Sequence, residues 1–221
     1  MAIFRSSNFG NPHIGLFAKA SDKLAVLDAS CSPKFFSAVS QALGVPVAKT
    51  TIGGSSFTGL FMAMNSKGAV VPSFCSKEEI AALKLHGLDV CTISGKFSAA
   101  GNNIAANDFG AIANPEIQSS ERRKISDCLG VEVVERHVAG FATAGSCLIA
   151  TNRGFAAHNR ATEEELKELQ SILRVTGQNC TVNTGVAFVS LGAMANSKGA
   201  LVGESCTGFE AGRLASALGL D

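Results

Sequence analysis

The sequence predicts a closed, five-fold pseudosymmetric α/β ring built from five β-β-α-β units of about 44 residues each, since 221 divided by five is about 44. The letters NSKGA occur at residues 65–69 and return at residues 196–200. Similar segments, each an apolar run, a turn and a second apolar run, fill the interval. They begin 44, 42, 44 and 45 residues apart, at Gly15, Gly59, Gly101, Gly145 and Ser190.

Each unit opens with a predicted hairpin. In the second unit the strands are expected at residues 60–64 and 69–71, with a turn at residues 65–68. Asparagine and glycine favour a tight turn because both tolerate a positive φ angle. The turn glycine recurs nine residues after each start, except that the first unit has leucine, in the order Leu24, Gly68, Gly110, Gly154 and Gly199.

A helix with recognisable ends follows each hairpin. Capping boxes are predicted at residues 76–79, 162–165 and 207–210, and Ser32 followed by Pro33 starts the first helix. Ser119 is the expected cap of the third helix, without an acidic residue three positions later. The fourth helix has no glycine after Leu173, whereas the others are expected to stop at Gly44, Gly87, Gly130 and Gly219.

A third strand completes the first four units, at residues 45–52, 88–93, 131–138 and 175–182. The fifth unit has none, while residues 1–9 form a surplus segment before the first unit. We expect this segment to supply the missing strand and close the ring, which also removes exposed sheet edges. The chain is then one domain, residues 1–221, with units 10–54, 55–95, 96–140, 141–185 and 186–221 plus the N-terminal strand 1–9.

Composition narrows the class of protein. The formal net charge of +1 and the 17% of charged residues give no electrostatic reason to expect a nucleic acid as the direct partner. No apolar run of about 18 residues predicts a membrane span, and residues 1–10 lack the apolar core of a signal peptide. The seven cysteines then predict reduced thiols in the cytoplasm.

Motifs for cofactor or metal chemistry are not found in the sequence. There is no GxxxxGK[ST], GxGxxG, HExxH or CxxC, and the four histidines are scattered. Cys206 stands just before a helix cap, where a thiol can become a nucleophile. Cys31 and Cys75 occupy the same position in other units, and Cys91 and Cys180 share a second repeat position. The pattern therefore favours packing over catalysis, and no cofactor or metal is expected.

Several segments carry a resemblance to a known family. They are TTIGGSSFTGL at residues 50–60, AAGNNIAANDFGAIANPEI at 99–117, LGVEV at 129–133, GSCLIATNRGFAAH at 145–158 and GAMANSKGALVGESCTGFE at 192–210. The five-fold ring resembles the pentein fold, and these segments resemble its translation initiation factor 6 branch over essentially the whole chain. The first unit departs most, with Leu24 at the turn. Eukaryotic members carry a further C-terminal tail, so the chain resembles an archaeal member.

The resemblance implies a cytoplasmic, monomeric, non-catalytic factor. It implies binding to the large ribosomal subunit, mainly through a ribosomal protein at the intersubunit face, with little nucleic-acid contact. It also implies hindered joining of the small subunit and a role in large-subunit maturation. Two alternatives stay open. One is a scaffold for another protein, and the other is a pentein enzyme acting on a guanidinium compound, with Cys206 as nucleophile and Asp108, Glu204 and His158 as candidate partners.

The start of each unit gives a candidate binding surface. In a five-fold ring these equivalent positions must cluster at one end of the axis. The glycines at these unit starts either allow tight turns or let a partner approach closely. Asn102 is the most informative position, because a tight turn does not require an asparagine there. The candidate ribosome-binding residues are Leu16, Leu60, Gly101, Asn102, Ser146 and Leu191.

Overall fold

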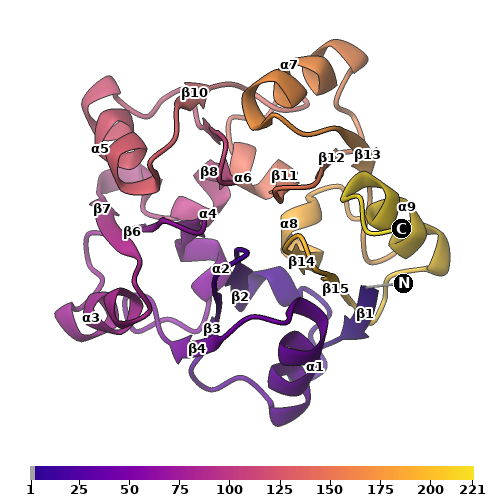
Figure 1. Cartoon of the computed structure of the whole chain (residues 1–221), viewed down its shortest axis with the longest axis horizontal. Coiled ribbons are helices and arrows are strands. Elements are labelled where there is room, and N and C mark those ends of the chain that lie inside the picture. The colour runs from indigo at the N-terminus through magenta and orange to yellow at the C-terminus, as the bar shows by residue number, and fades with distance from the viewer. Residues whose placement is uncertain (1–2) are drawn as a thin grey trace.

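Five three-stranded sheets surround a central axis, and each has a long helix on its outer side (Figure 1). This computed structural model describes residues 3–221. The predicted α/β ring is confirmed. Its sheets and helices are β2 (Ala18–Ala20), β3 (Ala25–Asp28), β4 (Val47–Thr50) and α1 (Pro33–Leu43); β5 (Ala63–Met64), β6 (Gly68–Pro72), β7 (Asp89–Ile93) and α3 (Lys77–Leu85); β8 (Ile104–Ala106), β9 (Ala111–Ala113), β10 (Val133–Glu135) and α5 (Ser119–Leu129); β11 (Leu148–Ala150), β12 (Phe155–His158), β13 (Gly177–Cys180) and α7 (Glu163–Leu173); and β1 (Ile3–Ser6), β14 (Ala193–Ala195), β15 (Ala200–Gly203) and α9 (Gly208–Ala217).

Every sheet has the same topology. Its inner and middle strands form an antiparallel hairpin, and its outer strand runs parallel to the middle one. The parallel pairing requires a crossover, and the long helix of each unit provides it. The result is five copies of one β-β-α-β unit, as the repeat predicts.

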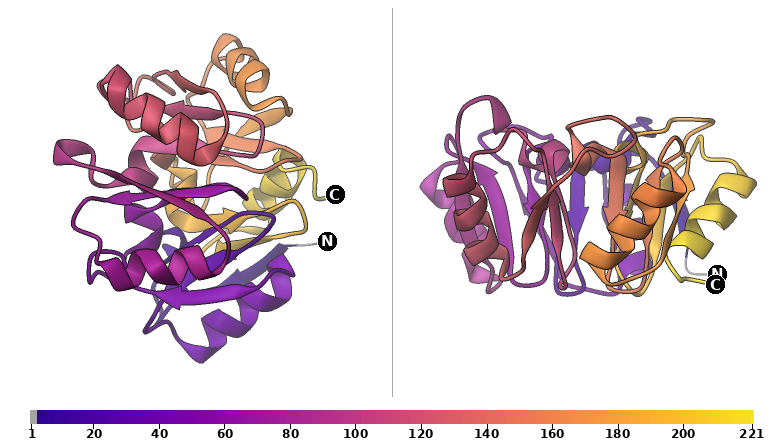
Figure 2. Two further views of the ribbon diagram at one scale, coloured as in Figure 1. Left: turned by 60° about the vertical axis from the view of Figure 1, so that its left-hand side comes forward. Right: turned by 90° about the horizontal axis from the view of Figure 1, so that it is seen from above.

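The N-terminal strand closes the ring. β1 pairs in parallel with β15, from Ile3 opposite Ala200 to Ser6 opposite Gly203. Beside it, Glu204 accepts a hydrogen bond from Ser7 Oγ at 2.8 Å and forms an ion pair with Lys34 at 2.7 Å. Figure 2 shows β1 next to the C-terminal end of the chain. Residues 1 and 2 of the predicted strand lie outside the described residues.

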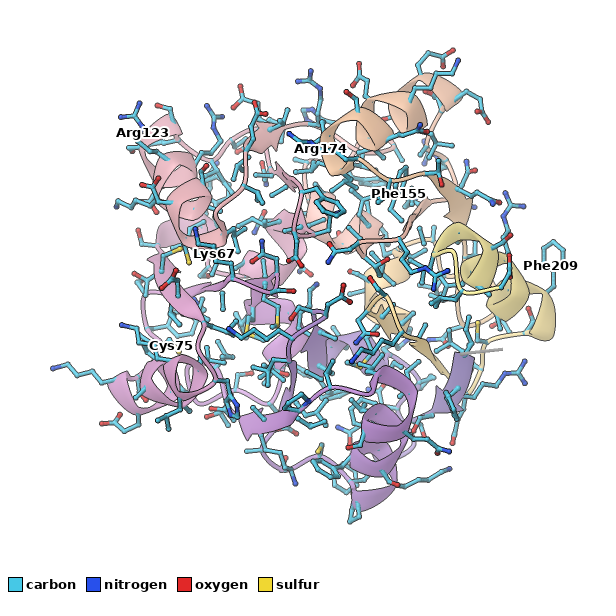
Figure 3. All side chains as sticks on the ribbon, in the orientation of Figure 1. Lys67, Cys75, Arg123, Phe155, Arg174 and Phe209 are labelled. Atoms are coloured by element: carbon cyan, nitrogen blue, oxygen red, sulfur yellow. The ribbon has the colours of Figure 1, made fainter. Side chains whose placement is uncertain are left out.

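The hydrophobic core is shared between neighbouring units. One cluster joins Leu27 and Phe35 of the first unit to Met194 and Leu201 of the fifth. Another surrounds Phe155, which is fully buried and lies in the interior in Figure 3. Because each cluster needs side chains from two units, a single unit cannot bury its own apolar face.

The helix ends agree with the sequence in four units and differ in one. The three predicted capping boxes are present, as at Ser76, whose side chain accepts from the Glu79 amide. In the third unit the cap position is Gln118, without a side-chain cap, and Ser119 is already helical. The fourth helix ends at Arg174, which adopts the left-handed backbone conformation (φ 56°) that glycine adopts at the other helix ends.

The start of each unit was predicted wrongly. Residues 60–64 were expected as a strand, but β5 contains only Ala63–Met64, and the one-turn helix α2 (Thr58–Phe61) precedes it. The third strands are also shorter than expected: all four begin later, and β4, β10 and β13 also end earlier, where the chain enters tight turns.

The hairpin glycine has a different role from the predicted one. Gly68 does not have a positive φ angle. A Cβ atom on it would lie 2.2 Å from the backbone oxygen of Cys128 in the next unit, and its equivalents Gly110 and Gly154 meet Ile172 and Ala217 in the same way. The glycine therefore lets the helix of the next unit approach the sheet. Within residues 3–221 the helices are too short or too polar to cross a membrane.

Candidate functional site

The predicted site residues lie in five short helical segments at one end of the ring. We call this the helical-turn end. Each segment contacts the next, and the last contacts the first, so they surround the axis (Figure 1). The segments are the 3-10 turn Ile14–Leu16, α2, α4 (Ala100–Asn103), α6 (Ala144–Cys147) and α8 (Val189–Gly192).

The glycines of these segments face the neighbouring unit and not the solvent. A Cβ atom on Gly59 would lie 2.0 Å from the backbone oxygen of Gly15, and one on Gly101 would lie 2.0 Å from that of Gly59. Gly145 meets Gly101 in the same manner at 2.3 Å. Their φ angles are not positive. These glycines are therefore not explained by a tight turn or by the approach of a partner. They are small because the backbone of the neighbouring unit packs directly against them.

Two of the predicted site residues are therefore inaccessible. Gly101 is buried against Gly59, and Ser146 is buried with its hydroxyl donating to the Thr143 carbonyl at 2.7 Å. This is a correction, since both were predicted to contact a partner. Repeat spacing locates a position along the chain, but it does not tell which side of a one-turn helix faces outward.

The remaining four candidates, Leu16, Leu60, Asn102 and Leu191, are half-buried at this end. Asn103 holds the local structure: its amide donates to the Ala99 carbonyl at 2.9 Å and its oxygen accepts from Asn114 at 2.8 Å. Within residues 3–221 the structure records no hydrogen bond for the Asn102 side chain. Its amide is therefore free to bind a partner.

Exposed aromatic side chains gather around the same end, and the sequence reasoning missed them. Phe57 precedes α2 and contacts Phe17, with ring centroids 5.5 Å apart. Phe74 packs edge-on against Phe61. Phe209, which is 77% exposed, projects from the first turn of α9 (Figure 3). Phe9, in the turn after β1, is exposed as well, and exposed aromatic side chains of this kind are common at protein interfaces.

Tight turns that precede the short helices are held by buried carboxylates. Gly53 and Gly54 both have positive φ angles, and their amides donate to Glu79 at 2.9 Å. Burial opposes ionisation of Glu79, but hydrogen bonds from the Thr51 hydroxyl and from backbone amides outweigh it and lower its pKa to about 2. Glu210 does the same for the turn at residues 182–186. The surface is thus fixed in shape before any partner arrives.

The opposite end of the ring consists of the five hairpin turns, and we call it the hairpin end. Asn107 ties two units together by donating to the carbonyls of Thr151 and Leu173, both at 2.9 Å. Near the axis, the Asn152 amide bridges the carboxylates of Asp22 and Asp108 at 2.7 and 2.6 Å.

Exposed cations surround that carboxylate pair. The third turn position reads Lys23, Lys67, Phe109, Arg153 and Lys198 along the five units, a pattern that the repeat alignment contains and that the sequence reasoning did not use. Lys23 and Lys198 donate to the terminal carbonyls Gly87 and Gly44 of neighbouring helices at 2.6 and 2.8 Å. They therefore act as helix C-terminal caps, which the helix dipole favours.

Lys19 lies in the narrow axial channel between the two ends. The cavity has a volume of about 30 Å³ and is lined otherwise by uncharged residues, among them Met64, Ile149 and Met194. Burial lowers the pKa of Lys19 to about 8. Met194 is the residue of the fifth unit that corresponds to Lys19, so a methionine fits the same position.

Lys19→Met should stabilise the protein at pH 7. The folded-state pKa lies below the unfolded value of about 10.4, so folding at pH 7 must bury a charge that the unfolded chain keeps in water. Since the side chain is partly exposed, we expect a gain of about 1–3 kcal/mol. The gain should shrink as pH rises from 8 to 10.5, where the folded lysine is already neutral. Urea denaturation of both proteins at pH 7 and pH 10 measures it, and a gain that grows with pH would contradict the assignment.

The residues considered for enzyme chemistry are not brought together. Cys206 is buried, and desolvation raises the pKa of its thiol. The His158 ring packs between Phe141 and Phe188, with centroids 5.1 and 5.2 Å away. Glu204 pairs with Lys34. Asp108 lies at the hairpin end, where its carboxylate accepts from the backbone amide of residue 66 and from a side-chain amide. Within the described part of the chain, no group of three potential metal ligands occurs either.

Comparison with known proteins supports the fold. The structure resembles that of dimethylarginine dimethylaminohydrolase in an adduct with S-methyl-L-thiocitrulline, with a TM-score of 0.50 and 11% sequence identity over 94% of this chain and 74% of that one. At this identity the likeness concerns the pentein fold alone.

Sequence comparisons are more specific. A translation initiation factor 6 from Methanosphaerula palustris is 37% identical over 210 residues, which is 95% of each chain. Those of Haloquadratum walsbyi and Staphylothermus marinus are 34% and 33% identical, over 98% and 95% of this chain and 96% and 94% of theirs. The sequence model of the eIF-6 family matches residues 3–217. This protein therefore belongs to the eIF-6 family.

Proposed function

We propose that this protein is a translation factor that binds the large ribosomal subunit, prevents its association with the small subunit, and takes part in large-subunit maturation. The observation that carries this proposal is the family match over residues 3–217, together with relatives named translation initiation factor 6. The factor acts in the cytoplasm as a monomer, without a cofactor and without catalysis. The buried, unactivated thiol of Cys206 supports the non-catalytic role.

The helical-turn end is the proposed contact surface. Its four half-buried candidate residues are uncharged, namely Leu16, Leu60, Asn102 and Leu191, and Phe57, just before α2, is exposed. A surface that combines apolar side chains with a free amide suits a ribosomal protein better than a phosphate backbone, which attracts lysine and arginine. The carboxylate-held turns support tight binding, because a preorganised surface loses little conformational entropy.

Asn102→Glu should weaken binding of the large subunit. A charge placed in an uncharged interface must be desolvated, and we expect a loss of about 1–2 kcal/mol, or roughly 5–30-fold in Kd. Stability should change by less than about 0.5 kcal/mol, because among residues 3–221 no hydrogen bond holds the Asn102 side chain in the fold. Fluorescence anisotropy of the labelled protein with purified large subunits measures Kd, and thermal unfolding checks the fold.

Phe109→Glu is the matched control at the hairpin end. Phe109 is 41% exposed, as is Phe57 at the helical-turn end. The proposed surface predicts that Phe109→Glu leaves Kd unchanged and that Phe57→Glu raises it. Loss of binding in Phe109→Glu, with normal binding in Asn102→Glu, would move the contact to the hairpin end. No subunit binding by the unaltered protein would reject the proposed function itself.

A further inference from the structure

Two cysteines meet at the boundary between the second and third units. Cys91 lies on β7, opposite Val70 of β6, and is half-buried. Cys128 lies in the last turn of α5, the helix of the next unit, and is 7% exposed. Since α5 packs directly on β6 and β7, both side chains occupy the same contact.

Two backbone carbonyl oxygens lie within reach of the Cys128 thiol, which can donate its one proton to either of them. The thiol lies 3.4 Å from the carbonyl oxygen of Ala69 and 3.5 Å from that of Asp89, between the two parallel strands. Cys91 packs against Ile125 and Leu129 of the same helix. Cys91 thus faces the end of α5 that carries Cys128, whose sulfur contacts the same strand two residues away, at Asp89.

The pKa values of the two thiols are shifted in opposite directions. The hydrogen bond from Cys91 lowers the pKa of Cys128, against the effect of burial. The same hydrogen bond raises the pKa of Cys91, and burial raises it further. At Cys31, Cys75, Cys147, Cys180 and Cys206, burial raises the pKa of each thiol. Cys128 is therefore the member of the pair that ionises more readily, and the thiolate is the reactive form.

We infer that Cys91 and Cys128 form a peroxide-sensitive site that closes to a reversible disulfide between the second and third units. The Cys128 sulfur attacks one oxygen of hydrogen peroxide, the O–O bond breaks, and the leaving hydroxide takes a proton to become water. The Cys91 sulfur then attacks the resulting sulfenic acid, the S–O bond breaks, and the proton of Cys91 leaves with the hydroxide as a second water. Two thiols are oxidised, and the peroxide is reduced to two molecules of water.

The repeat provides an internal comparison. Gln178, which pairs with Ala156 as Cys91 pairs with Val70, occupies the position of Cys91 in the fourth unit, and Ala217 occupies that of Cys128 in the fifth. The equivalence is structural, because Gly68 and Gly154 meet the backbone oxygens of Cys128 and Ala217 at 2.2 and 2.3 Å. The fourth sheet has glutamine where the second has Cys91, and Cys180 corresponds to Ile93, so Cys180 should stay a free thiol.

Peptide mapping of the folded, full-length protein tests the inference. The reduced protein is treated with a small excess of hydrogen peroxide, blocked with N-ethylmaleimide and digested without reductant. We expect one linked pair of peptides, containing Cys91 and Cys128, which dithiothreitol separates. In Cys91→Ser the sulfenic acid on Cys128 should persist long enough for dimedone to trap it. The absence of the linked pair, or its appearance only after unfolding in urea, would overturn the inference.

Two further measurements address the geometry. The disulfide should raise the Tm by about 5 °C or more, because it restricts the unfolded chain, and dithiothreitol should abolish the rise. The double variant Gln178→Cys/Ala217→Cys should create a second link, between residues 178 and 217, under the same peroxide dose. A folded double variant without that link, or a wild-type protein in which Cys180 is linked in place of Cys91, would contradict the geometric basis of the site.

Discussion

Removal of residues 1–9 should abolish the stable fold. β1 fills the edge of the sheet formed by β14 and β15, and Phe4 and Ile3 pack against the cores on its two sides. Its loss exposes the edge of β15 and opens both cores, so we expect a loss of more than about 4 kcal/mol, a large part of the stability of an ordinary domain. Urea denaturation followed by circular dichroism measures the change.

Moving the segment, instead of removing it, provides the control. Because β1 lies next to the C-terminal end of the chain, residues 1–9 can follow Asp221 through a short glycine-serine linker (Figure 2). In this variant the fifth unit becomes an ordinary β-β-α-β unit. It should recover most of the lost stability. An unchanged Tm in the truncated protein, or no recovery in the permuted one, would contradict the role of β1 in closing the ring.

Gly101→Ala should have the second largest effect. The added Cβ would lie 2.0 Å from the backbone oxygen of Gly59 and within 3 Å of those of Met62 and Leu60. Backbone atoms cannot turn away as a flexible side chain can, so the third unit must shift relative to the second. We expect a loss of about 3 kcal/mol or more, measured by urea denaturation.

Gly212→Ala is the matched substitution. Gly212 lies inside α9, and a Cβ atom there would meet no heavy atom within 4 Å. Alanine should stabilise this helix by about 0.5–1 kcal/mol, because glycine is a poor helix former. Similar effects at both positions would show that Gly101 contributes only backbone flexibility and not the contact between units.

Most of the fold could be predicted from the repeat, because the same pattern of apolar and turn residues occurs in five units. It predicts the three strands, the helix and the closing strand, and the capping box from Ser76 to Glu79 predicts a helix start that the structure confirms. The short helices escaped prediction since four residues such as Thr58–Phe61 have no helical periodicity. Their conformation comes from the packing of Gly59 on Gly15, a contact between units that a single sequence does not display.

The candidate site was only partly predictable for the same reason. The repeat placed Asn102 at one end of the ring, but it could not separate this residue from the buried Gly101 beside it. Glycine in a sequence indicates either a positive φ angle or a close approach. At Gly101 the reason is a close approach, and the approaching backbone belongs to the neighbouring unit and not to a partner. The exposed phenylalanines were missed because Phe57, Phe74 and Phe209 occupy different positions of the repeat.

Sedimentation of the protein with purified ribosomal subunits tests the central claim most directly. Large subunits are incubated with the protein, small subunits are added under conditions in which the two join, and the mixture is separated on a density gradient. We expect the protein in the free large-subunit peak and a reduced peak of joined ribosomes. Protein that stays at the top of the gradient while the subunits join normally would contradict the account.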